Sequence, residues 1–341
     1  MKPKAQNNSN SERCRETEIP DEILFGKSPA MSQVWQKAKK IAGMNVAVLL
    51  CGEAGTGKES VARWIHKNSS YASGPFVKVN CAAIPGALLE SELFGYARGA
   101  FTGAQTAKPG RIEGAEKGTL FLDEVSDLEI GLQSKLLHFL QDGCFSRLGE
   151  DMERTIETRL ICSTNKNLEE EIPTGRFRAD LYYRINVVQL RLPSLRDRKE
   201  DIPSLAEYLR VSHEQRFARK SEPLSRDMVG HLKELNWPGN VLELSNLIAR
   251  YVLVGSEGLA GRVAPRHVVT EIRQAADSGN GVLKRITKEA IREMERKVIR
   301  EALEANQWNR RRTAQALKIS YRTLMYKLRN IGSMAGPTLP E

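Results

Sequence analysis

The sequence predicts an α/β domain with a parallel sheet, followed by a helical segment and then by a separate all-α domain. Apolar strand-like runs alternate with amphipathic helical stretches from Phe25 to about Leu192, which is typical of a parallel sheet covered by helices on both faces. After Pro193 the strand patterns stop and only helical patterns follow. Positive charge is concentrated near the C-terminal end, which sets that end apart as a domain.

Length and composition indicate a globular chain of about two domains. Of the 341 residues, 40% are hydrophobic and 28% are charged. No stretch approaches the roughly 20 consecutive apolar residues that a membrane helix needs, and the polar start, Met1 to Pro20, lacks the apolar core of a signal peptide. We therefore expect a disordered lead-in over residues 1–20 and a cytoplasmic protein without membrane contact.

The cysteines predict neither a disulfide framework nor a zinc site. Their number is odd, they are widely spaced, and no C-x-x-C motif occurs. We expect all of them to be reduced thiols: Cys14, Cys51, Cys81, Cys144 and Cys162.

Five apolar runs predict the strands of the sheet. They are Val46–Cys51, Phe76–Val79, Thr119–Leu122, Arg159–Ser163 and Val187–Leu190. Three helices are predicted after them, Ile202–Phe217, Ser225–Leu235 and Asn240–Val254. The second and third begin with Ser225 and Asn240, whose side chains favour the N-cap position.

A linker and three more helices are predicted at the C-terminal end. Gln274–Gly281 (QAADSGNG) has the composition of a linker, and the helices are Thr287–Ala305, Arg310–Leu317 and Tyr321–Ile331. From Gly281 to Glu341 there are 14 Lys and Arg against 6 Asp and Glu. This balance indicates either a module that binds a polyanion or a solvated basic tail.

Gly52–Lys58 (GEAGTGK) predicts a phosphate-binding P-loop. It follows the apolar run VAVLL and precedes a helical stretch, which is the context such a loop requires. The glycines let backbone N–H groups point at phosphate oxygens, and Lys58 would neutralise the outer phosphates. Glu59 replaces the usual Ser or Thr, so a magnesium ion must rely more on another carboxylate and on water. The expected nucleotide-binding residues are Gly52, Glu53, Ala54, Gly55, Thr56, Gly57, Lys58 and Glu59.

Two acids at the end of a predicted strand supply that carboxylate. Asp123 and Glu124 follow the apolar run GTLFL, and the carboxyl edge of a parallel sheet faces the crevice where ligands bind. Asp123 would hold Mg²⁺. Glu124 would act as the general base that polarises the attacking water.

A loop between these elements, Gly99–Ala104 (GAFTGA), carries two glycines and an aromatic residue, which favours a mobile loop that contacts a partner. With this loop, GEAGTGKE, GTLFLDE and NWPGNV in order, the chain resembles the bacterial enhancer-binding proteins from about Ile23 to Ile331. These are AAA+ ATPases that activate RNA polymerase carrying sigma-54. The resemblance implies an AAA+ P-loop sheet with a helical lid, and hydrolysis of ATP with Mg²⁺. GAFTGA argues against a generic AAA+ loader or unfoldase.

The resemblance also implies roles for single residues. The loop residues would contact sigma-54 through Phe101 and Thr102 at the tip, and the full set is Gly99, Ala100, Phe101, Thr102, Gly103 and Ala104. Asn80 matches the residue that restrains the catalytic glutamate, here Glu124. Thr164 and Asn165 match the first sensor of the γ-phosphate.

Three further positions concern the roles of a neighbouring subunit and of the lid in ATP hydrolysis. Arg178 and Arg184 match the arginine fingers that enter the site of a neighbouring subunit, which implies a homo-oligomer, from dimer to hexameric ring. Leu242 stands where the family has a second-sensor arginine in the pattern WPGNxRE. Three explanations are open: a neighbouring basic residue substitutes for the arginine, the lid couples less tightly to nucleotide, or the protein is a weak ATPase. We favour altered coupling between lid and nucleotide.

The last two predicted helices have helix-turn-helix spacing and resemble the Fis-type DNA-binding domain. The expected DNA contacts are Arg310, Arg311, Arg312, Tyr321, Arg322, Thr323, Tyr326 and Lys327. The resemblance implies pairing through Thr287–Ala305 on double-stranded enhancer DNA. A small helical dimerisation module is the alternative.

The expected domains are a lead-in over 1–20, an AAA+ α/β ATPase subdomain over 21–195, a helical lid over 196–270, a linker over 271–286 and a helix-turn-helix domain over 287–333. Many relatives carry a regulatory domain in front of the ATPase, so we expect a regulator acting in trans, constitutive competence or a truncated gene product. The predicted function is a sigma-54-dependent activator that binds upstream DNA and remodels sigma-54 RNA polymerase by ATP hydrolysis in an oligomeric ring. The alternative is a DNA-binding repressor or architectural protein with an impaired ATPase.

Overall fold

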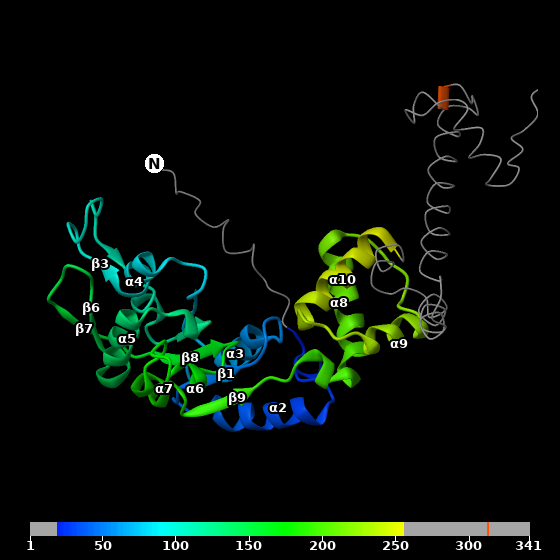
Figure 1. The fold of residues 1–341 in the computed structure, drawn as a ribbon, viewed down its shortest axis with the longest axis horizontal. Coiled ribbons are helices and arrows are strands. Elements are labelled where there is room, and N and C mark those ends of the chain that lie inside the picture. The colour runs from blue at the N-terminus through cyan, green and yellow to red at the C-terminus, as the bar shows by residue number, and fades with distance from the viewer. Residues whose placement is uncertain (1–18, 256–311, 314–341) are drawn as a thin grey trace, which may run out of the picture. The chain divides into compact units, whose positions relative to one another are not determined.

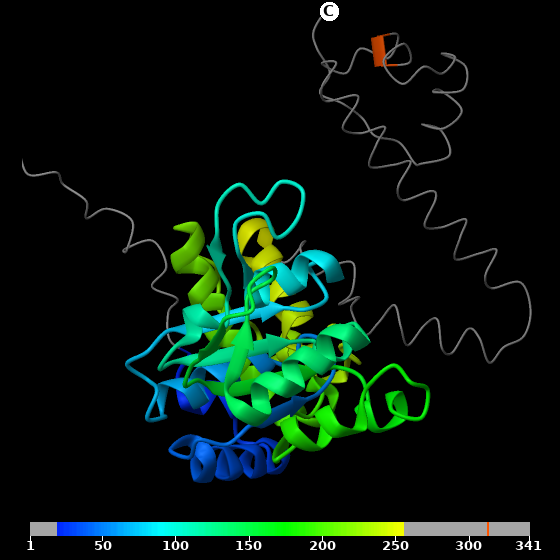
Figure 2. The same cartoon turned by 90° about the vertical axis from the view of Figure 1, so that its left-hand side faces the viewer.

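The computed structural model describes residues 19–255 and 312–313. The first range falls in one compact unit, Met1–Val263, and the second falls in another, Ala264–Glu341. The first unit contains a five-stranded sheet and a group of lid helices (Figure 1, Figure 2). The predicted lead-in over 1–18, the linker and the C-terminal helices lie outside the described residues, except for Arg312 and Thr313 in a helical segment.

The central sheet has the strand order β2-β5-β8-β1-β9, and each pair of neighbours is parallel. The strands are β1 Val48–Cys51, β2 Phe76–Asn80, β5 Thr119–Asp123, β8 Arg159–Thr164 and β9 Val188–Arg191. All of the predicted strands are confirmed, with small shifts at their ends. Four of them run one residue past the predicted end, to Asn80, Asp123, Thr164 and Arg191. Each of these strands therefore ends on a polar residue at the carboxyl edge of the sheet.

Two helices cover one face of the sheet. They are α2 Pro29–Ala42, capped by Ser28, and α3 Lys58–Lys67. Met31 from α2 and Ile65 from α3 pack in one buried cluster with Leu50 and Phe121 of the strands. This burial holds α3, and therefore the loop before it, in a fixed place against the sheet.

The opposite face of the sheet is covered by α4 Gly86–Phe94, α5 Ile130–Asp142 and α7 Ala179–Ile185. Leu49 and Leu122 of the strands pack there with Leu136 and Leu181 of the helices. Leu49 and Leu50 thus enter opposite cores, as the two-residue period of a strand requires. Two short helices complete this subdomain, α1 Asp21–Leu24 and α6 Leu168–Glu171.

Two small hairpin sheets interrupt the α/β pattern, and the sequence did not predict them. They are β3 Gly95–Tyr96 with β4 Lys108–Pro109, and β6 Cys144–Ser146 with β7 Glu153–Thr155. Hydrogen bonds join the two hairpins, from Ala97 N to Leu148 O at 2.9 Å and from Leu148 N to Gly95 O at 3.0 Å. The loop between β3 and β4 projects from the sheet at one end of the subdomain (Figure 1).

The lid consists of α8 Ile202–Phe217, α9 Arg226–Glu234 and α10 Asn240–Val254 around a separate core that includes Trp237. Ser225 caps α9 as predicted, accepting a hydrogen bond from Met228 N. The predicted Asn240 cap of α10 is wrong, because Gly239 holds that position and the Asn240 side chain is used elsewhere. None of the helices within residues 19–255 has the length and apolar character that a membrane crossing requires.

Candidate active site

The loop between β1 and α3 has the geometry that phosphate binding requires. β1 ends at Cys51, α3 begins at Lys58, and the residues between them form the P-loop. Gly55 and Gly57 adopt left-handed φ angles of 76° and 101°, which only glycine reaches without strain. The first N–H groups of α3, which have no acceptor within the helix, follow directly after this loop.

Lys58 is held inside the loop and beside Glu124. Its side chain is 6% exposed, and its ammonium donates to the carbonyl oxygens of Gly52 at 2.8 Å and Glu53 at 3.3 Å. The same nitrogen lies 3.3 Å from Oε1 of Glu124. The structure therefore brings together the predicted phosphate-binding cation and the predicted general base.

Asp123 and Glu124 lie at the carboxyl end of β5, as the sequence predicts. Asp123 accepts a hydrogen bond from the Ser163 hydroxyl. Glu124 has a left-handed φ of 57°, and its Oε2 accepts from Asn165 N at 2.9 Å. A left-handed non-glycine residue is strained, and such strain clusters at functional sites. The carboxylate of Asp123 is the oxygen donor that Mg²⁺ prefers, so this position fits a magnesium ligand.

Two more residues with predicted roles in sensing nucleotide, Thr164 and Asn80, lie at the ends of the strands on either side of β5. Thr164 ends β8, is fully buried, and its hydroxyl accepts from Lys166 N at 3.1 Å. Asn80 ends β2 directly opposite Asp123 in the sheet register. The side-chain oxygen of Asn80 accepts from the N–H groups of the turn that follows, at 3.0 and 3.2 Å. Restraint of Glu124 by Asn80 therefore stays a prediction, because Glu124 is held here by Lys58 and Asn165.

Glu59, which follows the P-loop lysine as the resemblance implies, is engaged in ion pairs. Its two oxygens accept from Lys78 at 2.5 Å and from Arg63 at 2.8 Å. Burial raises the pKa of Glu59, but the hydrogen bonds from Lys78 and Arg63 outweigh it, so the net pKa is lowered. Glu59 is therefore an ionised partner of two cations.

The start of lid helix α10 is bonded to the P-loop. The Asn240 amide donates to Ala54 O at 2.9 Å, and Val241 N donates to Gly55 O at 2.9 Å. The Asn240 oxygen accepts from Leu195 N at 2.8 Å. Asn240 is fully buried and adopts a φ of 51°. The lid and the loop therefore move together unless these bonds break.

Two arginines and one leucine complete the contact between lid and loop. Arg198 is 2% exposed and donates to Thr56 O at 2.9 Å. Hydrogen bonds from Arg196 and then Asn240 lower the pKa of Glu53 to about 2. Leu242 is 61% exposed, and its Cβ lies 3.1 Å from the place a Cβ on Gly55 would occupy. Leu242 thus lies next to the P-loop.

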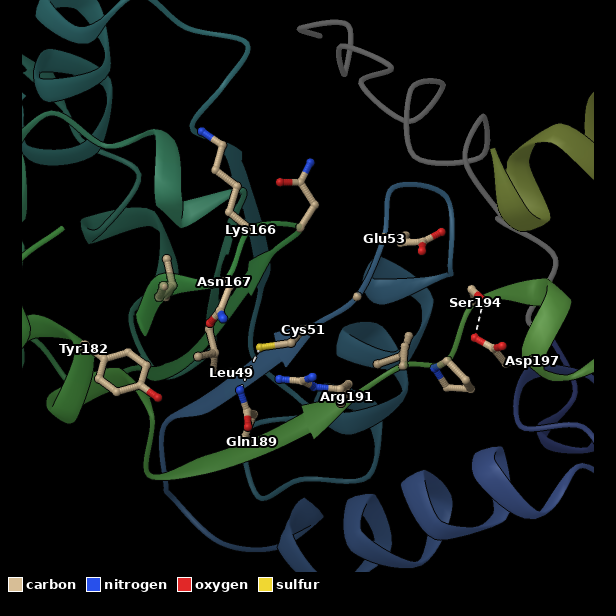
Figure 3. Close-up of a pocket in the computed structure, with 15 residues that line it drawn as sticks. Leu49, Cys51, Glu53, Lys166, Asn167, Tyr182, Gln189, Arg191, Ser194 and Asp197 are labelled. Atoms are coloured by element: carbon tan, nitrogen blue, oxygen red, sulfur yellow. Dashed lines mark hydrogen bonds between the residues drawn. The ribbon is translucent and has the colours of Figure 1, made fainter. Parts of the chain in front are cut away.

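A pocket of about 340 Å³ opens beside the P-loop (Figure 3). It lies at the carboxyl ends of β1, β8 and β9, and Cys51, Asn165 and Arg191 are among its lining residues. Figure 3 shows Cys51 facing Gln189, whose amide donates to its sulfur at 3.2 Å. Burial raises the pKa of the Cys51 thiol, which favours the protonated thiol over the thiolate.

Arg178 is the N-cap of α7, and Arg184 lies in the last turn of that helix. Neither lines this pocket, and Lys58, Asp123 and Glu124 do not line it either. Arg178 donates to Asp180 and, at 3.1 Å, to the Ser134 hydroxyl. Arg184 is exposed and donates to Leu140 O of α5 at 3.0 Å. Both guanidinium groups therefore lie at the surface formed by α5 and α7.

The loop Gly99–Ala104 has a compact turn and an exposed tip. Gly99 N donates to Ala104 O at 2.9 Å, and Gly99 and Gly103 have left-handed φ angles of 85° and 107°. Phe101 is 45% exposed and its ring packs edge-on against Tyr96, with 5.0 Å between centroids. Thr102 is also exposed. The tip presents both side chains to solvent, as a partner-contact loop requires.

Comparison with known proteins assigns a family to each part of the chain. Residues 24–191 match the sigma-54 interaction domain, residues 196–285 match an AAA+ ATPase lid domain, and residues 290–330 match the Fis family of bacterial regulatory proteins. The regulatory protein AtoC of Escherichia coli is 44% identical over 317 residues, which cover 91% of this chain and 68% of AtoC. The chain belongs to the sigma-54-dependent transcriptional activators.

Other relatives support the same assignment for this activator. The response regulator protein PilR of Pseudomonas aeruginosa is 40% identical over 92% of this chain and 70% of its own length. The structure of NtrX from Brucella abortus in complex with ADP has a TM-score of 0.64 and 32% identity, covering 91% of this chain and 69% of that chain. NtrX in complex with ATP has the same TM-score and identity and covers 93% and 70%.

The activator is therefore an ATPase that binds nucleotide, and its partners are sigma-54 and DNA. The predicted AAA+ fold, the helical lid and the Fis-type helix-turn-helix domain are confirmed. Of the predicted DNA-binding residues, the structure describes Arg312, which is exposed and precedes the buried Thr313. The others lie outside the described residues: Arg310, Arg311, Tyr321, Arg322, Thr323, Tyr326 and Lys327.

Sequence reasoning missed several residues that shape this site. Lys78 has the pattern of an ordinary strand residue, yet its ammonium lies 3.4 Å from Oδ2 of Asp123. Asn240 was predicted as a cap and instead bonds the P-loop. The sequence offers two local signals for such residues. One is a polar residue inside the strand run FVKVN, and the other is the pair of arginines in LRDR after Pro193. Only the fold shows which residues they meet.

Proposed function

We propose that the activator hydrolyses ATP between neighbouring subunits of a ring. One subunit supplies Lys58, Asp123 and Glu124, and the next supplies Arg178 and Arg184. The observation that carries this proposal is that the two groups have different partners. Lys58 lies 3.3 Å from Glu124, whereas the guanidinium of Arg184 bonds the carbonyl of Leu140 at the surface of α5. Fixed guanidinium groups stabilise charge on the transferred phosphoryl only if they reach it, and a second copy can present that surface.

The chemistry assigned to the residues follows from their contacts. Asp123 would hold Mg²⁺, which supplies positive charge to the phosphate oxygens when it is bound. Lys58 binds the outer phosphates. Its ammonium then leaves Glu124, and the freed carboxylate accepts a proton from the attacking water. Thr164 and Asn165 report the γ-phosphate through the strand end that carries them.

The remaining assignments extend the same proposal. Phe101 and Thr102 touch sigma-54 at the tip of Gly99–Ala104, and hydrolysis moves this loop against the polymerase to form the open complex. Dimers bind upstream DNA through the residues predicted for the C-terminal domain and assemble into a hexamer in the cytoplasm. The domain boundaries 21–195, 196–270 and 287–333 belong to this proposal as well.

A mixing experiment tests the shared site. Glu124→Gln removes the base, and Arg184→Ala removes a finger, so each variant alone should have almost no ATP turnover. In a mixed ring, an Arg184→Ala subunit keeps an intact base and can receive an intact finger from a Glu124→Gln neighbour. We expect turnover to reappear on mixing and to rise steeply with protein concentration.

The control is a mixture of Glu124→Gln with Lys58→Ala, which places both defects on the same side of the shared site. This mixture should stay inactive. If the first mixture stays inactive as well, or if Arg184→Ala alone retains full turnover, then Arg184 does not act across subunits and the proposed ring site is wrong.

A further inference from the structure

Lys78 lies beside the catalytic carboxylates, and the chemistry described above does not use it. It is the third residue of β2, and its ammonium reaches across to α3 and to β5. The nitrogen lies 2.5 Å from Oε2 of Glu59 and 3.4 Å from Oδ2 of Asp123. A single cation therefore bridges the predicted magnesium ligand and the residue that replaces the usual P-loop hydroxyl.

The bridge is fixed at both ends. The second oxygen of Glu59 accepts from Arg63 at 2.8 and 3.1 Å, and the Arg63 guanidinium lies 4.7 Å from the ring centre of Phe76, at the start of the strand that carries Lys78. The second oxygen of Asp123 accepts from the Ser163 hydroxyl. Every oxygen of both carboxylates thus has a partner, and the four charged groups form one ordered chain from Arg63 to Asp123.

The bridge is only partly accessible to water. The side chain of Lys78 is 33% exposed, that of Glu59 is 35% exposed and that of Asp123 is 16% exposed. Charges in such a position interact more strongly than fully solvated charges, because less water and salt screen them. The positive charge of Lys78 therefore affects the electrostatic potential at the carboxyl edge of the sheet, where Asp123 would bind a metal.

This arrangement differs from that of an ordinary P-loop in its charge. A Ser or Thr after the lysine brings a neutral ligand to the metal, whereas this chain brings a second carboxylate, Glu59. Both carboxylates lie within 3.4 Å of the Lys78 ammonium, and carboxylate oxygens are ligands that a divalent cation prefers. Arg63 offsets the charge of Glu59 from one side, and Lys78 lies between Glu59 and Asp123. In this arrangement an ammonium and a metal ion would compete for the same carboxylates, and the negative charge of bound phosphates would favour the metal.

We propose that Lys78 is a positioning residue that makes divalent-metal binding conditional on nucleotide. In the free protein its ammonium occupies the carboxylate pair of Asp123 and Glu59 and excludes the metal. When the triphosphate is bound, the same ammonium adds positive charge beside it, and the metal enters with the nucleotide. This inference rests on the proposed role of Asp123 as the magnesium ligand.

Replacement of Lys78 by methionine tests the inference through two binding measurements that do not depend on turnover. Mn²⁺ serves as the probe for the metal, and its binding to nucleotide-free protein is followed by electron paramagnetic resonance. Lys78→Met should bind Mn²⁺ about tenfold more tightly than the wild type, because one nearby positive charge is removed. The same variant should bind ATP more weakly in excess EDTA, by about threefold to tenfold, because that charge no longer attracts the phosphates.

The opposite directions of the two changes separate an electrostatic role from a damaged fold, which would weaken both. Lys78→Arg keeps the charge and should resemble the wild type in both measurements. Lys78→Gln keeps a hydrogen-bond donor without the charge and should follow Lys78→Met if methionine destabilises the sheet. Lys135→Met removes a lysine that is paired with Glu90 and not with Asp123 or Glu59, and it should change neither affinity.

One further variant distinguishes a failure of this inference from a failure of the proposed metal ligand. Asp123→Asn should abolish the tight Mn²⁺ binding of Lys78→Met. If Mn²⁺ binding persists, then Asp123 is not the ligand and the proposed active site is wrong at that position. If Asp123→Asn abolishes it but Lys78→Met binds Mn²⁺ no more tightly than the wild type, then the metal ligand stands and the role of Lys78 is overturned.

Discussion

Asn240, the first residue of lid helix α10, donates a hydrogen bond from its side-chain amide to the carbonyl oxygen of Ala54, 2.9 Å away in the P-loop. These residues lie 186 positions apart in the chain. The same side chain accepts from Leu195 N at 2.8 Å, where the chain enters the lid. One buried amide thus links the nucleotide loop, the lid and the segment that joins them. A shift of the loop would therefore strain or break the hydrogen bonds that hold the lid to it.

Asn240→Ala should destabilise the activator by about 1–3 kcal/mol, because it leaves Leu195 N buried without a partner and also removes the hydrogen bond to Ala54 O. Asn240→Gly removes the same hydrogen bonds but tolerates the φ of 51°. It should therefore be more stable than the alanine variant by about 1 kcal/mol. Urea unfolding measures both differences. If the alanine variant unfolds at the same urea concentration as the wild type, the amide does not hold the loop.

Leu242→Arg should raise the affinity for ATP by about tenfold, because it places a guanidinium over the P-loop, beside Gly55. A change in turnover should accompany it, since the lid would then respond more strongly to the phosphates. Leu242→Gln is the matched control, polar and shorter but uncharged. Binding of ATP to the two variants and the wild type is measured by calorimetry. Equal affinities and equal kinetics for Leu242 and Leu242→Arg would refute a tuning role for this position.

The hairpin β6–β7 should respond to pH through one ion pair. Arg147 donates to both oxygens of Glu113 at 2.8 and 2.7 Å, and this hydrogen bonding lowers the pKa of Glu113 from 4.5. The folded-state pKa therefore lies below the unfolded one. The pair stabilises the protein above the unfolded pKa, and this stability is lost as the pH falls through the folded pKa.

Glu113→Gln removes that contribution, so its loss of stability relative to the wild type should be largest at neutral pH and should shrink as the pH falls through the folded pKa. Urea midpoints at about pH 7 and about pH 3.5 give the comparison. Glu153→Gln, an exposed carboxylate on the same hairpin, should leave the midpoints close to those of the wild type. A constant difference between Glu113→Gln and the wild type at both pH values would contradict the assigned cause.

The sheet could be predicted from the sequence because its information is local. Apolar runs in the order of the chain mark the buried strands, and the alternation of Leu49 and Leu50 between two cores follows from strand geometry. The strands β3 and β6 could not be found in this way. They are two and three residues long, and their pairing depends on contacts between hairpins rather than on a periodic pattern.

In the candidate site, too, residues in local motifs could be predicted and residues with distant partners could not. Lys58, Asp123 and Glu124 belong to contiguous motifs whose chemistry is visible in the residues themselves. Asn240 and Lys78 could not be placed, because their partners lie far away in the chain and are brought close only by the packing of the lid and of α3. The wrong N-cap prediction for Asn240 has this cause: local preference favoured a cap, and a long-range bond to the P-loop took the side chain instead.

The last prediction concerns the exposed tip of the loop Gly99–Ala104. Thr102 is exposed between two glycines with left-handed backbone, so its removal should cost the fold little, and Thr102→Ala should keep the ATP turnover of the wild type. Its binding to purified sigma-54, measured in the presence of ATP, should be lost. Thr106→Ala changes another exposed threonine, just outside the loop Gly99–Ala104, and should keep both properties. Equal loss of sigma-54 binding in both variants would point to general damage of the β3–β4 hairpin, and unchanged binding in Thr102→Ala would remove this residue from the contact with sigma-54.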